Sequence, residues 1–309
     1  MEINKKRKIL VTGANGFIGC SLCTFLKEKG CFVRGAVRNN AHNVSEADEY
    51  IQVGDISELT DWSNALCDVD FVVHLAGRAH VMREQESDPD YVYHRINAMG
   101  TKRLAEQAVK SGIKRFIFIS SIKANGKDPY GASKQEAENS LVCIAAETGL
   151  QVVILRLPLV YGPGVKANFR NLIKLVNSGV PLPFKNVTNR RSLIYLGNLL
   201  DAIITCVNHP LAAGEIFMLS DGQDISTPDL IKMIAFALGK RPLLFPLSTG
   251  ILMTLCKIAG KGEEVGKLVG SLTVDSSKIR NLLSWKPPFT LEEGIKETID
   301  HYIHYETHF

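Results

Sequence analysis

The feature of this sequence that most constrains its fold is a regular alternation of short apolar runs with longer helical patterns in the first half of the chain. The apolar runs fall at 9–12, 31–37, 51–53, 71–76, 115–120 and 151–157, and the helical patterns at 17–29, 58–67, 90–111 and 130–148. Strands that are apolar on both faces and alternate with helices predict an α/β fold with a doubly wound parallel sheet. Ligands of such a sheet bind at the carboxyl ends of its strands.

After about residue 162 the alternation becomes irregular, because Gly162-Pro163-Gly164 and Pro181-Leu182-Pro183 interrupt it. We therefore expect two parts. The first is a Rossmann-like domain over residues 1–165, and the second is a smaller C-terminal lobe over residues 166–309 that is partly interleaved with the first.

Composition and charge exclude several classes of function. Hydrophobic residues make up 45% of the chain, which allows a buried core, and 36 Lys plus Arg against 32 Asp plus Glu are too evenly balanced for a dedicated nucleic-acid binder. The seven cysteines are scattered, and Cys20 and Cys23 have no second pair to complete a metal site, so we expect no metal and a reducing cytoplasm. The uncharged segment 243–256 is too short to span a bilayer of ~30 Å, which favours a buried helix or a wall of the second lobe over a membrane span.

A glycine-rich segment follows the first apolar run and opens the first helical pattern. Its glycines are spaced G-x-x-G-x-x-G, which allows a tight turn and lets backbone N–H groups approach a pyrophosphate at a helix N-terminus. The segment predicts a dinucleotide site. The residues that we assign to the site in this segment are Gly13, Asn15, Gly16, Phe17, Ile18 and Gly19.

The end of the second strand bears on which dinucleotide is bound. Binders of NAD place an acidic residue there for the ribose 2′-hydroxyl, but this chain has Val37 and Arg38. A guanidinium can bind a 2′-phosphate, so Arg38 favours NADP(H), while NAD(H) stays possible if Arg38 is an ordinary strand-end cation. Asp55 and Ile56 end the third strand, where they could bind the adenine amine, although Asp55 could also serve only to form a turn.

A candidate catalytic pair lies in the helical pattern that begins near residue 130. Tyr130 and Lys134 are four residues apart and therefore share one helix face. We expect the Lys134 ammonium and an oxidised nicotinamide to lower the pKa of the Tyr130 phenol, so that Tyr130 can act as a general acid. Ser120 and Ser121 end the preceding strand, where a hydroxyl can hydrogen-bond the same substrate oxygen.

With these motifs the chain resembles the extended short-chain dehydrogenase/reductase superfamily, in its nucleotide-sugar branch, over nearly its whole length. Within that branch it is most similar to bacterial UDP-sugar 4-epimerases and 4-ketoreductases of surface-polysaccharide and O-antigen synthesis, including the reductases that form UDP-N-acetylquinovosamine. The motifs that carry the resemblance are the glycine segment, Asp55, His74-Leu75-Ala76-Gly77, Asn97, Ser120-Ser121, Tyr130-x-x-x-Lys134, Tyr161-Gly162-Pro163-Gly164, Arg191-Ser192-Leu193-Ile194-Tyr195, Asp275-Ser276-Ser277-Lys278 and Trp285-Lys286-Pro287.

The resemblance implies a role for each matching position. Ser121 would polarise the sugar oxygen, with Ser120 as the fallback, Tyr130 would be the acid/base, and Lys134 would bind the nicotinamide ribose. Asn97 would be a structural or proton-relay residue, and His74 is interpreted as a packing residue. The remaining assignments are Leu75, Ala76 and Gly77 in the cofactor site, and Asn168 and Arg191 at the diphosphate of the sugar nucleotide.

The chain departs from the family pattern at three places, the first being Leu159, where the family often has Asn. The usual second diphosphate arginine is missing, so Lys261, Lys267 or Arg280 could substitute, and we assign Arg280. The connection between Ser121 and Tyr130 is shorter than in the family, which predicts an open site unless loop residues are missing between Asn125 and Asp128.

These observations favour a 4-ketoreductase that moves hydride from NADPH to C4 of a UDP-4-keto-6-deoxy-N-acetylhexosamine. One alternative is a UDP-N-acetylhexosamine 4-epimerase with tightly bound NAD, and another is a non-catalytic dinucleotide-sensing module. The resemblance also implies a homodimer, formed through the helices predicted at 90–111 and 130–149.

Overall fold

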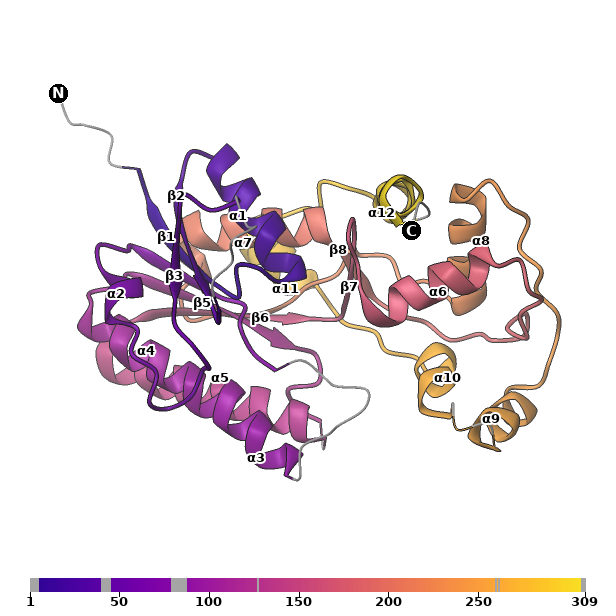
Figure 1. Cartoon of the computed structure of the whole chain (residues 1–309), viewed down its shortest axis with the longest axis horizontal. Helices are drawn as coiled ribbons and strands as arrows, with labels where there is room; N and C mark the ends of the chain where they lie inside the picture. The colour runs from indigo at the N-terminus through magenta and orange to yellow at the C-terminus, as the bar shows by residue number, and fades with distance from the viewer. Residues whose placement is uncertain are drawn as a thin grey trace. The chain divides into compact units, whose positions relative to one another are not determined.

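The computed structural model describes residues 6–39, 46–78, 88–126, 128–258, 260 and 262–306. The chain folds into two compact units (Figure 1). Unit 1 comprises residues 1–157, 200–218 and 277–285, and unit 2 comprises residues 158–199, 219–276 and 286–309. The boundary predicted after residue 165 therefore falls inside unit 2, and two later segments of the chain belong to unit 1.

Unit 1 is built on a seven-stranded sheet in which every strand pairs in parallel, in the order β3-β2-β1-β4-β5-β6-β9. This confirms the predicted α/β class and the doubly wound sheet. The strand order reverses between β1 and β4, which is the switch point where such sheets bind ligands. The strands are β1 Lys8–Thr12, β2 Phe32–Val37, β3 Glu49–Gln52, β4 Phe71–His74, β5 Arg115–Ser121, β6 Gln151–Leu157 and β9 Ile216–Met218.

Helices cover both faces of this sheet, with α4 and α5 below it and α1, α7 and α11 above it in Figure 1. The strands are buried on both faces because both helical layers pack on them, and Leu104, Phe116 and Leu141 belong to one continuous core between strands and helices. The helices are α1 Phe17–Glu28, α2 Ser63–Leu66, α3 Pro89–Tyr93, α4 Gly100–Lys110, α5 Pro129–Thr148, α7 Leu196–Asn208, which continues from unit 2, and α11 Ser277–Leu283.

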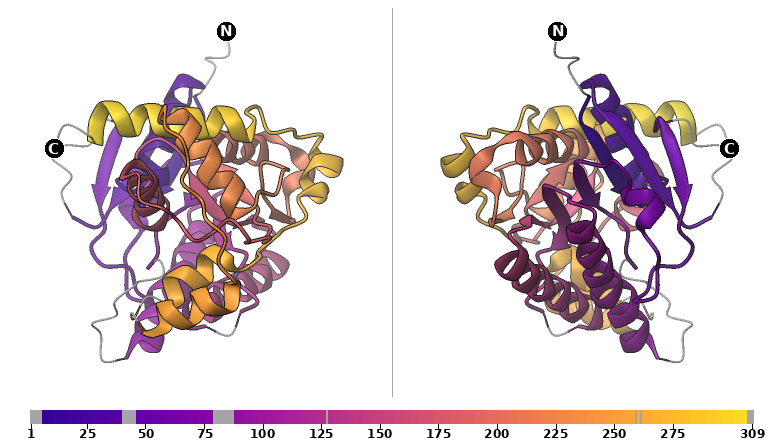
Figure 2. Two further views of the ribbon diagram at one scale, coloured as in Figure 1. Left: turned by 90° about the vertical axis from the view of Figure 1, so that its right-hand side faces the viewer. Right: turned by 90° about the vertical axis from the view of Figure 1, so that its left-hand side faces the viewer.

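Unit 2 has a two-stranded parallel sheet of β7 (Leu159–Tyr161) and β8 (Leu193–Tyr195). Helix α8 packs on both α6 and α12, while α9 and α10 lie side by side at one end of the unit (Figures 1 and 2). Tyr161 donates a hydrogen bond to Asp221 at 2.8 Å, which fixes β7 against the segment after β9. The helices are α6 Ala167–Asn177, α8 Thr227–Ala237, α9 Thr249–Ile258, α10 Gly262–Val269 and α12 Leu291–Glu306.

Three helical predictions need correction. The pattern at 90–111 forms α3 and α4 with a π-helical turn, η1 (His94–Met99), between them. The pattern at 58–67 is helical only in α2, because the Thr60 hydroxyl binds the backbone of Ser57 and Asp55 and holds the preceding residues in a turn. Much of the segment 243–256, predicted as buried, is exposed. No helix among the described residues is long and apolar enough to cross a membrane.

Candidate functional site

The glycine segment joins β1 to α1 at the switch point of the sheet. Gly13 has a φ of 66°, and a Cβ there would lie 3.1 Å from the backbone of Ala76, so the chain can pass only as glycine. A Cβ on Gly19 would lie 2.1 Å from the Gly13 carbonyl oxygen, so α1 begins directly against the loop. Gly16, the N-cap residue of α1, has no side chain that could cap the helix. The N–H groups of its first turn and the positive end of its dipole therefore form a site suited to an anion such as a pyrophosphate.

A cavity of about 420 Å³ adjoins this loop. Its volume lies in the range typical of cofactor sites. A Cβ on Gly77 would lie 2.8 Å from the Asn97 Oδ1, so the loop after β4 can pack this closely against Asn97 because residue 77 has no side chain. The lining residues come from the glycine segment, the segments that follow β2 and β3, the start of α2, and the loop after β4, and include Gly13, Asn15, Gly16, Arg38, Asp55, Ile56, Trp62, Leu75, Ala76 and Gly77.

Trp62 also lines the cavity, and sequence reasoning did not select it. Its side chain is fully buried, and its indole N–H has no hydrogen-bond partner among the described residues. A buried donor without a partner is costly, which is consistent with a ligand that supplies an acceptor here. The glycine cradle, the uncapped helix and this donor together fit a dinucleotide.

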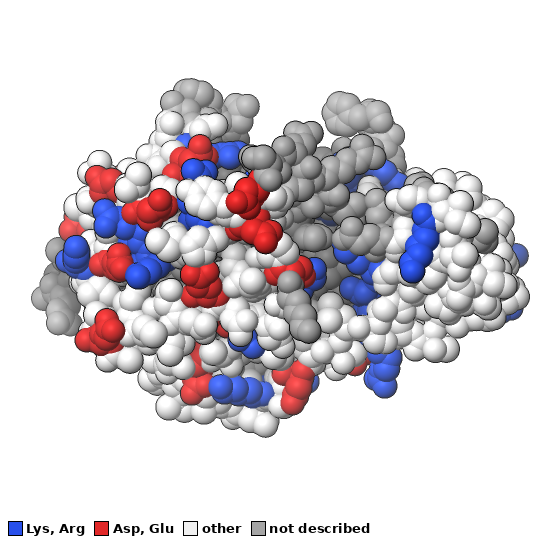
Figure 3. Space-filling view, turned by 90° about the horizontal axis from the view of Figure 1, so that it is seen from below, with Lys and Arg blue, Asp and Glu red and all other residues white. Residues whose placement is uncertain are grey.

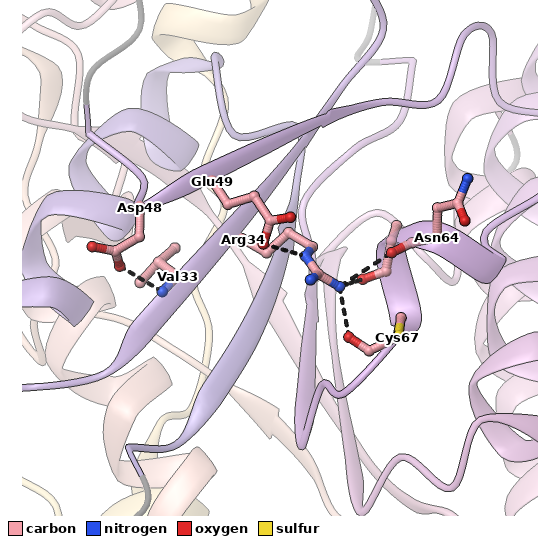
Figure 4. A network of polar contacts seen from close by, with 7 residues as sticks. Val33, Arg34, Asp48, Glu49, Asn64 and Cys67 are labelled. Atoms are coloured by element: carbon pink, nitrogen blue, oxygen red, sulfur yellow. Dashed lines mark hydrogen bonds and ion pairs between the residues drawn. The ribbon is translucent and has the colours of Figure 1, made fainter.

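Arg34 of β2 fixes the segment that carries Trp62 (Figure 4). Its Nε donates to Glu49 of β3 at 2.9 Å, and its Nη1 donates to the carbonyl oxygens of Asn64, Ala65 and Cys67 at 2.7–3.1 Å. A guanidinium at the C-terminal end of α2 satisfies carbonyls that the helix itself leaves unpaired. The cavity wall that contains Trp62 is thereby held by the sheet.

Arg38 and Asp55, which were considered separately in the sequence, lie together at the mouth of this cavity. The Arg38 Nη1 is 3.5 Å from the Asp55 Oδ1, and the two side chains are 72% and 79% exposed. An ion pair this exposed contributes little to stability. Its importance lies in charge, since any group that approaches Arg38 here also meets a carboxylate.

Asn97 lies in the π-helical turn and is almost fully buried. Its Oδ1 accepts from the Arg78 backbone N–H at 2.8 Å, and its Nδ2 donates to the Arg78 carbonyl and to the Ser133 hydroxyl at 3.0 Å each. Asn97 thus ties the loop after β4 to helix α5. Of the two roles considered for it, this geometry supplies the structural one.

His74 ends β4 and is enclosed by two threonines. Burial, with a smaller contribution from the Lys134 charge, lowers the pKa of His74 to about 3, so its ring is neutral. The Thr12 hydroxyl oxygen accepts from the backbone N–H groups of Leu75 and Ala76, which leaves its hydrogen for the His74 Nδ1 at 2.7 Å. The His74 Nε2 then donates to Thr101 at 3.0 Å. His74 therefore has a packing and hydrogen-bonding role.

Tyr130 lies in the first turn of α5. The Asp128 carboxylate caps this helix by accepting from the Gly131 N–H at 2.8 Å, and Pro129 occupies the first turn. The Tyr130 phenol hydrogen-bonds the Ser121 side chain, and its ring meets Tyr93 edge-on at 6.0 Å. Burial raises the pKa of Tyr130, and the Ser121 hydrogen bond only partly offsets this. The expectation of a lowered pKa is thus wrong for the protein alone, because burial and the nearby Asp128 charge both raise the pKa of the phenol.

Lys134 lies one turn further along the same helix face and is buried. Its Nζ donates to the Ile119 carbonyl at 3.0 Å, lies 4.6 Å from the centre of the Phe118 ring, and is 3.6 Å from the position of a Cβ on Gly77. Burial lowers the pKa of Lys134 to about 8, against the opposing charge of Glu138. Because Gly77 lines the cavity, the Lys134 amine lies close to the cavity wall.

The two serines at the end of β5 have different partners. The Ser120 hydroxyl donates to Glu138 at 2.5 Å, and Glu138 is buried in an ion pair with Arg156, whose Nη2 is 2.6 Å from the carboxylate. Successive residues of a strand point to opposite faces, so Ser121 takes the other side, next to Tyr130. The structure places Ser121, and not Ser120, beside the phenol.

The predicted diphosphate residues are distributed over both units. Asn168 is exposed at the start of α6 in unit 2. The Arg191 guanidinium donates to the carbonyls of Lys267 and Gly270 and so holds the end of α10, and burial lowers its pKa. Arg280, in unit 1, has buried Nε and Nη2 atoms without a hydrogen-bond partner among the described residues.

Glu138 was not selected from the sequence, although it lies next to the site. It follows Lys134 by four residues, and this spacing places both side chains on one helix face.

The sequence profile of a family described as "NAD dependent epimerase/dehydratase family" matches residues 9–219. The chain is 44% identical to a UDP-glucose 4-epimerase of Vibrio cholerae, with 94% of each chain aligned. It is 27% identical to a UDP-2-acetamido-2,6-beta-L-arabino-hexul-4-ose reductase of Pseudomonas aeruginosa, over 74% of this chain and 56% of the relative. A UDP-glucuronic acid 4-epimerase of Bacillus cereus, solved with UDP-glucuronic acid and NAD, superposes with a TM-score of 0.75 at 26% identity, covering 95% of this chain and 98% of that one.

Proposed function

This chain belongs to the NAD dependent epimerase/dehydratase family, and we propose that it is a UDP-sugar 4-epimerase that keeps its NAD bound. The observation that carries the proposal is the placement of the Tyr130 phenol against Ser121, with the Lys134 amine 3.6 Å from the Cβ position of Gly77 in the cavity wall. The predicted identity as an NAD(P)-dependent short-chain dehydrogenase/reductase is confirmed. The preference for a 4-ketoreductase gives way to the epimerase alternative, because a relative 44% identical over 94% of the chain is a UDP-glucose 4-epimerase.

Two observations support NAD over the NADP(H) favoured by Arg38 alone. The Bacillus cereus 4-epimerase with the same fold was solved with NAD. In this chain the Asp55 carboxylate lies 3.5 Å from Arg38, so a 2′-phosphate drawn to the guanidinium would also be repelled by a carboxylate. The Trp62 N–H and the residues Asp55 and Ile56 would hold the adenine end, and the uncapped start of α1 would hold the pyrophosphate.

The catalytic chemistry of this chain would rest on proton handling at the sugar C4 oxygen. NAD, when bound, supplies a hydride acceptor that can also return the hydride. Tyr130 would take the proton of the C4 hydroxyl and later give it back, and Ser121 would hydrogen-bond the same oxygen. General acid–base catalysis of this kind contributes ~10²–10⁴ in rate.

Lys134 would set the charge on Tyr130. With a pKa of about 8, the buried amine carries its proton in most molecules at neutral pH. Its positive charge favours the phenolate, which burial alone disfavours. Hydrogen bonds from the amine to the nicotinamide ribose would also orient the cofactor.

For the substrate, we propose that Asn168 and Arg191 of unit 2 bind the diphosphate of a UDP-hexose, while the assignment of Arg280 stays a prediction from the sequence. Among the described residues, only the Arg191 Nη1 is seen to bind the carbonyls at the end of α10. The other N–H groups of the guanidinium could donate paired hydrogen bonds to a phosphate. The homodimer implied by the family resemblance remains a prediction.

The test is a substrate panel with cofactor identification. Mass spectrometry of the denatured protein should find NAD, and the purified enzyme should interconvert UDP-glucose and UDP-galactose without added cofactor. UDP-N-acetylhexosamines form the second pair of the panel. NADP or an empty site, with NADPH consumed only when a UDP-4-keto-6-deoxy sugar is added, would replace the epimerase by the 4-ketoreductase, which Arg38 and the 27% identical reductase favour. Cofactor binding without turnover of any substrate would favour the sensing module.

A further inference from the structure

One segment of unit 2, residues 239–258, exposes apolar side chains between cations. Lys240 and Arg241 begin it and Lys257 lies near its end, while the residues between Arg241 and Lys257 carry no charge and the segment has no acidic residue. The exposed fractions are 53% for Leu243, 41% for Phe245, 53% for Ile251 and 81% for Ile258. We call this segment the apolar-basic segment.

Backbone hydrogen bonds hold the first part of the apolar-basic segment in place. The Leu243 carbonyl accepts from the Leu182 N–H at 2.7 Å, and the Phe245 N–H donates to the Leu182 carbonyl at 3.0 Å. Leu243 and Phe245 are two residues apart along this extended stretch, so their side chains leave on the same side. Leu243 and Phe245 are therefore exposed although backbone hydrogen bonds fix the stretch that contains them.

The second part of the segment is helix α9, which has two unlike faces. Ile251, Thr254 and Ile258 follow the spacing i, i+3, i+7 and are exposed. Leu252 is buried, and the Met253 methyl lies 3.6 Å from where a Cβ on Gly266 of α10 would be, so the opposite face packs within unit 2. The exposed side of α9, with Ile251 and Ile258, is thus not the side that packs within unit 2.

The charges around these apolar side chains indicate what would cover them. Among the charged side chains that Figure 3 draws in colour, the acidic ones gather over unit 1, while those over unit 2 are mainly cations. Exposed apolar residues flanked by Lys and Arg are the combination that binds an anionic lipid surface, since the cations meet headgroups and the apolar side chains enter the interface. A soluble protein partner of the same chemistry would need a matching acidic and apolar face.

We propose that the apolar-basic segment docks the enzyme reversibly on an anionic membrane surface, without crossing it. The inference is independent of the epimerase proposal, because it rests on unit 2 residues that take no part in the proton chemistry. Docking would place the enzyme at a membrane where its nucleotide-sugar product could be used.

The experiment is vesicle flotation of the full-length protein with phosphatidylcholine alone and with about a quarter phosphatidylglycerol. Wild-type protein should float with the anionic vesicles and much less with the neutral ones, and raising the salt to about 0.5 M should weaken binding. The variant Leu243→Ser/Ile251→Ser/Ile258→Ser should lose about tenfold or more in binding, and Arg241→Gln/Lys257→Gln should bind severalfold less and lose its salt sensitivity.

The matched control is Leu211→Ser/Tyr305→Ser, which removes exposed apolar side chains elsewhere, 55% and 68% exposed, and should bind as wild type. No flotation of wild-type protein, or equal flotation of the triple variant, would overturn the proposal. A wild-type dimer that dissociates in the triple variant, with no vesicle binding, would assign the segment to a second copy instead. Turnover of UDP-galactose without vesicles should be equal in all variants, so failure of the epimerase assay and failure of docking are separate results.

Discussion

The two ends of one face of helix α5 show how the same scaffold makes an anchor and a reactive site. Tyr130, Lys134 and Glu138 follow one another at intervals of four residues, so all three lie on this face. At the Glu138 end the carboxylate accepts hydrogen bonds from the Ser120 hydroxyl and from the Arg156 guanidinium. At the Tyr130 end, burial raises the pKa of the phenol and lowers the pKa of Lys134 to about 8. A charge placed next to either group would shift its pKa again. On one helix face, burial of a hydrogen-bonded ion pair thus makes an anchor, whereas burial of a phenol and an amine shifts their pKa values.

The largest expected effect is on turnover. Tyr130→Phe removes the phenolic proton and should lower kcat of UDP-sugar interconversion by about 10²–10⁴-fold. Because the ring packing against Tyr93 is kept, the thermal unfolding temperature and the bound NAD should stay close to wild type. Calorimetry, mass spectrometry of the cofactor and a kinetic assay measure the three quantities. Unchanged kcat would remove Tyr130 from the chemistry.

At the Glu138 end of the helix face, a substitution should change the stability of the fold more than the turnover. Glu138→Ala leaves the half-buried Arg156 without its carboxylate. Breaking a buried pair costs about 3–5 kcal/mol in the free energy of unfolding, and the partial exposure of Arg156 places the expected cost at the lower end of this range. Urea unfolding measures this cost, with Glu136→Ala as the control, since Glu136 is an exposed acid on the same helix that pairs only with His94 among the described residues. Equal effects of the two substitutions would show that the Glu138 end is no anchor.

The two serines sharpen the contrast further. Ser121→Ala should lower kcat by about 10–100-fold with little change in stability, because its hydroxyl adjoins Tyr130. Ser120→Ala should lower the free energy of unfolding by about 1–3 kcal/mol, because Glu138 loses a hydrogen bond, and should leave kcat within about threefold. The same urea and kinetic assays apply to both. The reversed pattern would exchange the roles of the two residues.

The last prediction is a pH-dependent gain in stability. The pKa of Lys134 is about 8 in the folded protein, against 10.5 for a free lysine side chain, so below pH 8 the fold must bury a charge. That penalty is relieved as pH rises from about 8 to 10.5, since the unfolded chain then holds the proton that the folded chain has lost. Lys134→Met should therefore stabilise the cofactor-free protein by roughly 1–3 kcal/mol at pH 7, and the gain should vanish near pH 10. Lys102→Met, at an exposed lysine, is the control in pH-dependent urea unfolding, and a gain that is independent of pH would contradict this account.

The parts of the site that could be predicted from the sequence are those that depend on short local patterns. The glycine segment, the end of β3 at Asp55 and the Tyr130–Lys134 spacing each depend on a few consecutive residues, and the alternation of apolar runs and helices sufficed for the sheet. The parallel register could not be predicted in this way. It sets Ser120 opposite Arg156, and this pairing lets Glu138 reach both and take Ser120 away from the reactive end.

Contacts between distant segments account for the remaining differences. Arg38 and Asp55 are seventeen residues apart, and only the pairing of β2 with β3 brings them to 3.5 Å. The π-helical turn that carries Asn97 has no signature in the sequence, which reads as one long helix. The segment 243–256 was interpreted as buried because it is apolar, but whether an apolar residue is covered depends on the neighbours that the fold provides.

The most direct test of the central claim is the fate of the C4 hydrogen during turnover. The purified enzyme is incubated in D₂O with UDP-galactose, and proton NMR follows the sugar. The account predicts that UDP-glucose forms with its C4 hydrogen retained, without net change in nicotinamide absorbance, and that Tyr130→Phe stops the conversion. Solvent deuterium at C4, or no interconversion of any UDP-sugar pair while NADPH is consumed with a 4-keto sugar, would contradict it.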